Sequence, residues 1–328
     1  MKPILALRAR LPAPRRSQAG LTLVETMIAM AIGLVIVAAL SAVFVGSSHS
    51  RREVQSSADT IETGRYAADL LARELSAAGF LGTLVKPVGT TVAICSTAVA
   101  DWSDSLAVHA VGLNNGEADP ACFARKPGTD AIFVQRASTC TAGSPGCEAE
   151  SAANAYLQVS ECGSEYGVTP SVLAVGGDSS SFTLKTKDCA AATAAKRKLI
   201  RRAYFVSAAD VLSYVDLGLA GPSAAVPLVE DVEQLQFSYA FDADGDGTAE
   251  CFASTLAGCV GAEWPQVVGV RVWVLSRSES TSRNAAAAMQ FVMDDTTIDV
   301  PASASGNLKR RVYTTYVPFV TPKSRREH

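Results

Sequence analysis

The pattern of hydrophobic residues is dominated by one long apolar run near the N-terminus. Residues 21–45 contain a single ionisable side chain, Glu25, among apolar, small and hydroxyl-bearing residues. An α-helix needs about 20 apolar residues to cross the hydrocarbon core of a bilayer, so this run predicts a membrane-spanning helix. The residues before it include five basic side chains and no acidic one (Lys2, Arg8, Arg10, Arg15 and Arg16). This charge bias predicts a cytoplasmic N-terminus and a periplasmic location for the rest of the chain.

The helical periodicity continues beyond the apolar run in amphipathic form. From Val54 onward an apolar residue recurs every seven positions, and further residues fill the same face (Ile61, Ala68 and Leu75, with Ala58, Leu71 and Ala78). This spacing predicts a helix with one buried stripe. We therefore expect a continuous helix over residues 21–78 that ends at Gly79, because glycine commonly terminates helices.

Beyond residue 80 the pattern changes to short β-type runs separated by Gly, Ser, Asn and Pro. Several of these runs alternate polar and apolar residues, which favours antiparallel sheets with one solvated face. The strand candidates are residues 131–135, 181–185, 199–206, 232–239, 267–275 and 311–319. Segments 138–180 and 276–309 are rich in Ala, Ser and Gly, and we expect long loops there, with a short helical turn at residues 152–158.

Glu25 is the most informative exception to the apolar pattern. An unpaired carboxylate within a membrane-spanning segment costs roughly 2.5–3.5 kcal/mol or more, so it requires a functional reason. A secretory signal peptide explains the run poorly, because it has a shorter apolar core followed by a small-residue cleavage site, whereas Gly20 precedes the run. An ordinary membrane anchor explains the hydrophobicity but neither Gly20 nor Glu25.

Residues 20–25, GLTLVE, followed by the apolar run, resemble the class III signal of type IV pilins and type II secretion pseudopilins. The resemblance implies that prepilin peptidase cleaves between Gly20 and Leu21 and methylates the new amino group of Leu21, although phenylalanine is commoner there. It also implies that Glu25 pairs with the Leu21 amine of an adjacent subunit and guides subunits into register. An ammonium and a carboxylate, each costly alone at this depth, are tolerable as a pair.

A second resemblance concerns the end of the helix and the C-terminal half. Residues 64–80 carry a GRYA, LL, EL and AGF pattern similar to that of PilW-type minor pilins, and residues 228–247, 264–278 and 308–319 extend the similarity. Residues 81–195 resemble the family poorly. The resemblance implies a minor pilin that takes part in initiating type IV pilus assembly and supports adhesion and twitching motility. The implied partners are other minor pilins, the major pilin, prepilin peptidase, the inner membrane and a tip adhesin.

The patterns and the resemblance together predict a pilin-like α+β fold, with a long N-terminal helix packed on a mainly antiparallel β-sheet domain. The predicted divisions are a removed leader (1–20), a transmembrane helix (21–45), its amphipathic continuation (46–79) and a periplasmic β-rich domain (80–328). The implied location is the bacterial inner membrane, as a single-pass protein, and then the pilus at its tip.

Two other functions stay open at this point. A minor pseudopilin of a type II secretion system would share the N-terminus and the fold, although the GRYA to AGF and DADGDG segments favour the pilus. A generic membrane-anchored binding module would still function if Gly20 were substituted and the chain left uncleaved. A pilin would instead lose its filaments.

Eight cysteines lie between Cys95 and Cys259, all beyond the apolar run. An even count in a periplasmic domain predicts disulfides, although sequence alone permits many pairings. We expect sequential neighbours to pair, as Cys95–Cys122, Cys140–Cys147, Cys162–Cys189 and Cys251–Cys259. A zinc site is disfavoured, because the sequence has no CxxC pair and only three histidines.

Composition and motifs argue against several function classes. The formal net charge is −3, and removing the five positive charges of the leader gives −8 for the rest of the chain. This acidic balance argues against nucleic-acid binding, which normally requires a basic domain. The sequence has no HExxH, GxSxG, P-loop or dinucleotide-binding motif, so we predict a protein that is not an enzyme and needs no cofactor.

Residues 242–247, DADGDG, allow two interpretations. Asp242, Asp244 and Asp246 match the first half of a calcium loop, in which alternating oxygens surround a hard cation. The twelfth position of such a loop would be Ala253, where the EF-hand pattern requires a bidentate Glu. The same dipeptides suit a tight Asp-Gly hairpin turn after a strand, and we prefer the turn.

Overall fold

The computed structural model describes residues 20, 22–279, 288–300 and 308–322. The predicted leader up to residue 19 and the predicted new N-terminus, Leu21, lie outside the described residues. The chain divides into two compact units, residues 1–54 and 55–328. The second compact unit begins within the long helix, so the second half of this helix belongs to the same unit as the sheets.

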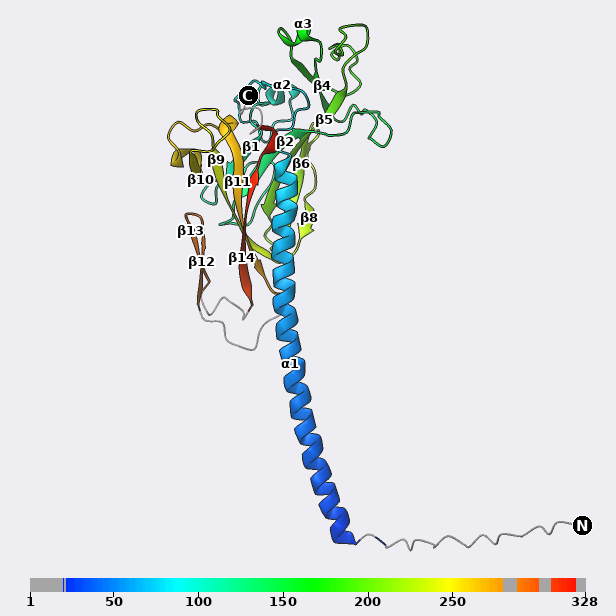
Figure 1. The fold of residues 1–328 in the computed structure, drawn as a ribbon, viewed down its shortest axis with the longest axis vertical. Coiled ribbons are helices and arrows are strands. Elements are labelled where there is room, and N and C mark those ends of the chain that lie inside the picture. Colours follow the sequence, from blue (N-terminus) through cyan, green and yellow to red (C-terminus); the bar gives the residue numbers. More distant parts are fainter. Residues whose placement is uncertain (1–19, 21, 280–287, 301–307, 323–328) are drawn as a thin grey trace, which may run out of the picture. The chain divides into compact units, whose positions relative to one another are not determined.

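Helix α1, Leu23–Ser76, contributes its apolar part to the first unit and its amphipathic part to the second (Figure 1). Among the described residues it is the helix that is long and apolar enough to cross a membrane. The predicted bounds, residues 21–78, lie close to these ends. Gly79 follows the last turn with a positive φ of 73°, and its N–H donates to the Gln135 carbonyl at 2.9 Å. A glycine therefore ends the helical segment as predicted.

The second unit contains a first sheet of eight antiparallel strands (Figure 1). These are β1 (Ala110–Leu113), β2 (Ala131–Ala137), β3 (Ala155–Val159), β4 (Ser171–Val175), β5 (Lys196–Val206), β6 (Leu212–Gly218), β7 (Gly221–Pro222) and β8 (Val226–Val229). The order is β1-β2-β5-β3-β4, with β6 beside β5, and β7 and β8 beside β6. Strand β5 pairs with two different strands along its length: residues 196–198 pair with β3, and residues 202–206 pair with β6. Short helices α2 (Val99–Ser103) and α3 (Gly163–Tyr166) lie in the connections.

A second antiparallel sheet has the order β10-β9-β11-β14. Its strands are β9 (Val232–Phe241), β10 (Cys251–Ala253), β11 (Val267–Arg277) and β14 (Arg310–Pro318), and the 3₁₀ turns η1 (Leu256–Gly258) and η2 (Trp264–Gln266) precede β11. Strands β12 (Met289–Met293) and β13 (Thr296–Val300) form a separate hairpin. Buried Met293 packs with Trp273 and Leu275 of β11, so the hairpin covers part of the outer face of this sheet.

The main core of the second unit lies between α1 and both sheets. Leu71 and Leu75 of α1 are fully buried and share one cluster with Tyr204 of the first sheet and Phe237 of the second. The predicted stripe is therefore correct from Ala68 onward. It is wrong at Val54 and Ala58, which are exposed. A seven-residue repeat drifts around a helix of 3.6 residues per turn, and in the described part of the helix burial begins only at Thr60.

The two sheets are joined by a short seam at the start of β2. The backbone N–H of Asp130 donates to the Leu235 carbonyl at 2.8 Å, and the Phe237 N–H donates to the Asp130 carboxylate at 2.8 Å. One residue before β2 thus satisfies two backbone groups of β9. The seam lets a single helix face contact both sheets.

The predicted α+β class is confirmed, and so are five of the six strand candidates. The loop prediction for residues 138–180 is wrong, because β3 and β4 lie there, and residues 152–158 contain a strand start rather than a helical turn. Residues 181–185 are not a strand. The Gln158 side chain binds this segment, accepting from the Leu184 N–H at 3.1 Å, and so replaces a strand partner. The loop over residues 276–309 is interrupted by β12 and β13.

Candidate assembly site at the helix N-terminus

The first turn of α1 is fixed by a side-chain cap. The Thr22 hydroxyl accepts the backbone N–H of Glu25 at 3.3 Å, so Thr22 is the N-cap and Glu25 is the third helical residue. Thr26 adds a hydroxyl bond to the Leu23 carbonyl at 2.8 Å. A Thr-x-x-Glu sequence at a helix start is the signature of a capping box, and an acidic group there also faces the positive end of the helix dipole. Sequence reasoning missed this role of Thr22, although the spacing signals it.

The Glu25 carboxylate projects from an apolar surface. Its neighbours along the helix are exposed apolar side chains, and no cation of the described chain lies within ion-pair distance. Gly20 is also exposed, and a methyl group added there would meet nothing within 4 Å. Among the described residues, nothing packs against Gly20 and no cation lies beside Glu25.

The eight cysteines form four disulfides in the structure. The pairs are those expected from sequence, Cys95–Cys122, Cys140–Cys147, Cys162–Cys189 and Cys251–Cys259. Seven of the eight cysteines lie in connections outside the strands, and Cys251 is the first residue of β10. A disulfide restricts the unfolded chain and is most useful in such loop-rich regions.

The acidic loop between β9 and β10 gathers four carboxylates. One oxygen from each of Asp242, Asp244, Asp246 and Glu250 lies within 4.8 Å of the others, so the group could hold a metal ion. The loop also has a turn of its own. Fully buried Asp242 accepts the N–H groups of Gly245 at 2.6 Å and Gly247 at 2.9 Å. Glu250 is a member of the group that sequence reasoning did not include.

Comparison with known families gives two matches. Residues 15–41 match the prokaryotic N-terminal methylation motif, and residues 188–320 match the family Type IV Pilus-assembly protein W. These matches support a type IV pilin of the PilW family. The two matches together indicate a minor pilin of the type IV pilus and do not favour the type II secretion alternative.

Comparisons with individual proteins add little. A search of curated proteins finds no match. Among solved structures, the type IV-like pilin TTHA1219 from Thermus thermophilus is similar, with 14% sequence identity over 82% of this chain and 98% of that chain and a TM-score of 0.33.

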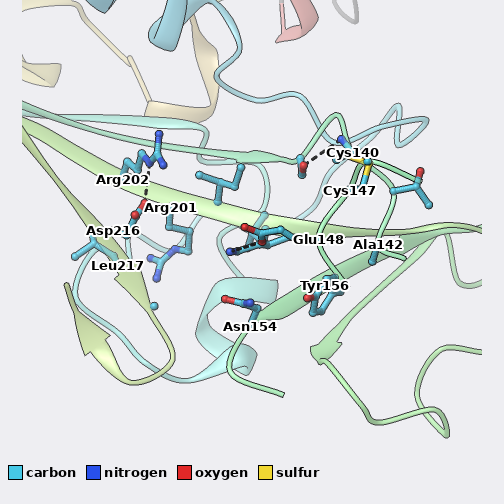
Figure 2. Close-up of a pocket in the computed structure, with 17 residues that line it drawn as sticks. Cys140, Ala142, Cys147, Glu148, Asn154, Tyr156, Arg201, Arg202, Asp216 and Leu217 are labelled. Atoms are coloured by element: carbon cyan, nitrogen blue, oxygen red, sulfur yellow. Dashed lines mark hydrogen bonds and ion pairs between the residues drawn. A yellow bond between two sulfur atoms is a disulfide. The ribbon is translucent and has the colours of Figure 1, made fainter. Parts of the chain in front are cut away.

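The globular unit of this pilin has a cavity of about 520 Å³ at the branch of β5 (Figure 2). It lies where β5 passes from β3 to β6, beside the Cys140–Cys147 loop. Four of the five charged side chains that line it are paired: Lys198 contacts Glu148 at 3.3 Å, and Arg202 contacts Asp216 at 2.7 Å. The fifth is Arg201, whose guanidinium donates to backbone carbonyls.

Arg201, beside the same cavity, has a structural role. Its guanidinium lies over the Trp102 ring at 4.4 Å and donates to the carbonyls of Ser96 and Ala93. Burial lowers the pKa of Arg201 to about 10. The side chain thereby fastens the connection that precedes β1 onto the first sheet.

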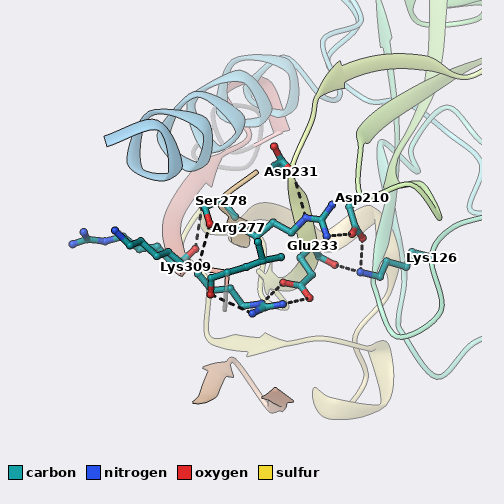
Figure 3. A network of polar contacts seen from close by, with 11 residues as sticks. Lys126, Asp210, Asp231, Glu233, Arg277, Ser278 and Lys309 are labelled. Carbon is teal, nitrogen blue, oxygen red and sulfur yellow. Dashed lines mark hydrogen bonds and ion pairs between the residues drawn. The ribbon is translucent and has the colours of Figure 1, made fainter. Parts of the chain in front are cut away.

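A polar network joins the two sheets of the pilin at the opposite end of β5 (Figure 3). Asp210 contacts Lys126 at 2.5 Å and Arg277 at 3.0 Å, and Arg277 also contacts Asp231 at 3.3 Å. Nearby, Glu233 of β9 pairs with Arg310 of β14 at 2.5 Å. Because Lys126 also donates to the Glu233 carbonyl at 2.9 Å, the network links the β5–β6 turn to β9, β11 and β14 of the second sheet.

Proposed function

We propose that prepilin peptidase cleaves this chain between Gly20 and Leu21, methylates the Leu21 amine, and leaves a subunit anchored by the apolar half of α1. The globular unit would then lie in the periplasm. There the subunit joins other minor pilins and the major pilin to initiate pilus assembly, and through the pilus it supports adhesion and twitching motility. The methylation motif at residues 15–41 supports the processing step.

One observation carries the assembly role. The Glu25 backbone N–H is satisfied by Thr22, while its carboxylate has no cation in the described part of its own chain. In a bilayer, a lone carboxylate is costly and is stabilised by an adjacent cation. We propose that the Leu21 ammonium of a neighbouring subunit is that cation. The pair would draw each new subunit to a fixed depth.

Substitution of Glu25 by Gln tests this role. We expect Glu25→Gln to reduce filaments at least tenfold, counted by electron microscopy, while cleavage after Gly20 continues. Glu62→Gln is the matched control, because Glu62 is an exposed glutamate of the same helix outside the apolar run. Normal filament numbers from Glu25→Gln would contradict the proposal.

Processing and disulfide formation can be measured together. The intact mass of the purified mature protein should correspond to a chain that starts at Leu21, carries one added methyl group and lacks eight cysteine hydrogens. A mass that includes the leader would contradict processing. A mass higher by two hydrogens per pair would instead show that a disulfide is missing.

The tip is the position that we propose within the pilus, with a tip adhesin as a neighbour. Immunogold labelling of the globular unit on sheared filaments tests this position, because a tip protein labels one end and a shaft protein labels the length.

For the acidic loop, calcium is the cation whose hard oxygen ligands the four carboxylates provide. A calcium titration of the melting temperature distinguishes an ion site from a hairpin turn. A calcium-dependent rise in Tm that is lost in Asp244→Asn indicates a calcium site. An unchanged Tm indicates a turn held by Asp242 alone.

A further inference from the structure

The outer face of the second sheet carries a flat aromatic surface. Phe252 of β10 and Tyr316 of β14 are 42% and 45% exposed, and their ring centroids lie 6.0 Å apart. Strands β9 and β11 lie between β10 and β14, so these rings meet only by lying across the sheet. The register places small residues beneath them, since Phe252 pairs with Ala240 and Ala240 pairs with Gly269.

Gly269 is explained by this arrangement. A Cβ atom at position 269 would lie 2.4 Å from the Tyr316 hydroxyl and 2.8 Å from the adjacent ring carbon. The backbone at this position has no positive φ that would itself call for glycine. The absent side chain therefore makes room for the tyrosine ring to lie flat. Glycine at position 269 thus allows the exposed Tyr316 ring to keep this orientation.

Arg271 adds a charge to the same surface. It pairs with Tyr316 in the β11–β14 register, and its guanidinium carbon lies 4.9 Å from the Phe252 ring centroid and 5.8 Å from that of Trp273. Within the described ranges the side chain of half-buried Arg271 makes no hydrogen bond and no ion pair. Burial raises the pKa of the Asp294 carboxyl, and the positive charge of Arg271 opposes this rise in part. Asp294 lies beyond ion-pair distance of Arg271. The guanidinium is thus oriented by aromatic rings while its donors stay available.

We propose that Phe252, Arg271 and Tyr316 form a docking surface for an acidic side chain flanked by apolar residues on a neighbouring protein subunit. A planar guanidinium matches a carboxylate through two parallel hydrogen bonds, and ring stacking holds it ready for that contact. Aromatic residues and arginine are the residue types that concentrate binding energy at interfaces. The flanking rings supply apolar area for the neighbours of the acid.

The charges around the surface favour a single acidic side chain on an apolar segment over a polyanion. Arg271 is a single cation, and the loop that leads into β10 carries exposed Asp244, Asp246 and Glu250. A nucleic acid or an anionic lipid surface would meet these carboxylates and be repelled. One carboxylate on an otherwise apolar segment can reach Arg271 without such a clash. The inference adds a contact surface to the proposed assembly role and does not depend on Glu25.

Photocrosslinking in pilus-producing cells tests the surface in the full-length protein. The probe is benzoylphenylalanine at Thr314, an exposed residue of β14 on the same face, so the three proposed residues stay intact. We expect a crosslink to another protein subunit, at a peptide in which Asp or Glu adjoins apolar residues. Arg271→Gln should lower the yield at least tenfold, and Arg271→Lys should give an intermediate yield, because lysine keeps the charge without the planar fork.

Arg311→Gln is the matched control, because Arg311 is an exposed arginine of β14 on the opposite face, and it should leave the yield unchanged. Melting temperatures of the variants confirm that each is folded. Reversal of the crosslinked acid to arginine should restore the crosslink to Arg271→Glu. An unchanged yield in Arg271→Gln, a crosslink only to lipid, or no crosslink would overturn the inference. Filament counts report the assembly role separately.

Discussion

At the residue scale, the start of α1 depends on the Thr22 hydroxyl. It is the side-chain acceptor for the Glu25 N–H at a helix end where backbone donors lack partners. Loss of such a cap costs about 1 kcal/mol in water, and an unsatisfied N–H costs several kcal/mol in a bilayer. The cap therefore fixes the backbone of Glu25, from which the proposed contact with a neighbouring subunit would be made.

Thr22→Val should consequently reduce filament number, whereas Thr22→Ser should keep it near the wild-type level. Valine preserves shape but removes the acceptor, so the first turn frays and Glu25 loses its fixed position. Cleavage after Gly20, measured by the intact mass of the mature protein, should be unchanged in both variants. Wild-type filament numbers from Thr22→Val would show that the cap has no part in assembly.

Asp130 is the buried carboxylate with the largest consequence for pH dependence. It accepts N–H groups from Asn115 and Phe237 at 2.8 Å each, and no described cation pairs with it. Burial raises its pKa from 3.8 to about 7, with Arg125 and the two hydrogen bonds opposing the rise and Asp295 adding to it. The folded state therefore holds a proton on Asp130 more tightly than the unfolded state does.

A raised pKa contributes stability that is fully present below the unfolded value and is lost as pH rises through the folded value. The shift from 3.8 to about 7 corresponds to about 4 kcal/mol. The Tm of the wild type should fall relative to that of Asp130→Asn as pH rises from 4 to 8. Asp69→Asn, at an exposed site on α1, should show no such trend. A difference in Tm that is independent of pH would contradict the assignment.

At the element scale, the contact between α1 and β14 depends on Gly64. A Cβ atom at this position would lie 2.2 Å from the Tyr313 ring and 2.7 Å from the Ser276 hydroxyl. Ser276 also donates to the Thr60 carbonyl at 3.0 Å, so the helix and the sheet are locked together one turn earlier. An added methyl group has nowhere to go without moving the helix.

Gly64→Ala should destabilise the globular unit by about 1–3 kcal/mol, the usual cost of overpacking a well-packed core. The additional change Tyr313→Leu should recover part of the loss by removing the clashing ring. Gly46→Ala is the control, because a methyl group there meets nothing within 4 Å and alanine favours the helix. Thermal melts of the purified protein give the comparison. Equal effects at Gly64 and Gly46 would contradict the packing argument.

Elements were predictable where one face is buried and the other solvated. The runs at β5, β9, β11 and β14 alternate or are strongly β-branched, so their type follows from residues alone. Strand β3 was missed because all of its residues are buried and alanine-rich sequence surrounds it, so no alternation appears. The Gln158 clamp on residues 181–185 and the seam at Asp130 were also unpredictable, since each joins residues far apart in the chain.

The candidate site at the helix start stays a prediction, and it rests on a different kind of signal. Its signals, Gly20, Glu25 and the apolar run, are local and contrast with their surroundings. The surface at Phe252, Arg271 and Tyr316 gave no such signal. It exists only because four strands bring three distant residues onto one face.

At the scale of the whole molecule, the two sheets form one unit through polar contacts as well as apolar core. Asp210 is central to these contacts, because its carboxylate joins Lys126 and Arg277 across the sheets with a side chain only 15% exposed. Its φ of 60° is a left-handed conformation that asparagine also tolerates. Asp210→Asn therefore removes the charge without straining the turn.

We expect Asp210→Asn to lower the free energy of unfolding by about 1–3 kcal/mol, because it leaves two partly buried cations with less compensation. Asp216→Asn is the matched control. It breaks the ion pair with Arg202, but its side chain is 47% exposed, so the loss should stay below about 1 kcal/mol. Denaturant titration with two probes, Trp fluorescence and far-UV circular dichroism, measures both variants. If both variants lose the same stability, the network at Asp210 is no more than a set of surface pairs, and the apolar core alone holds the sheets together.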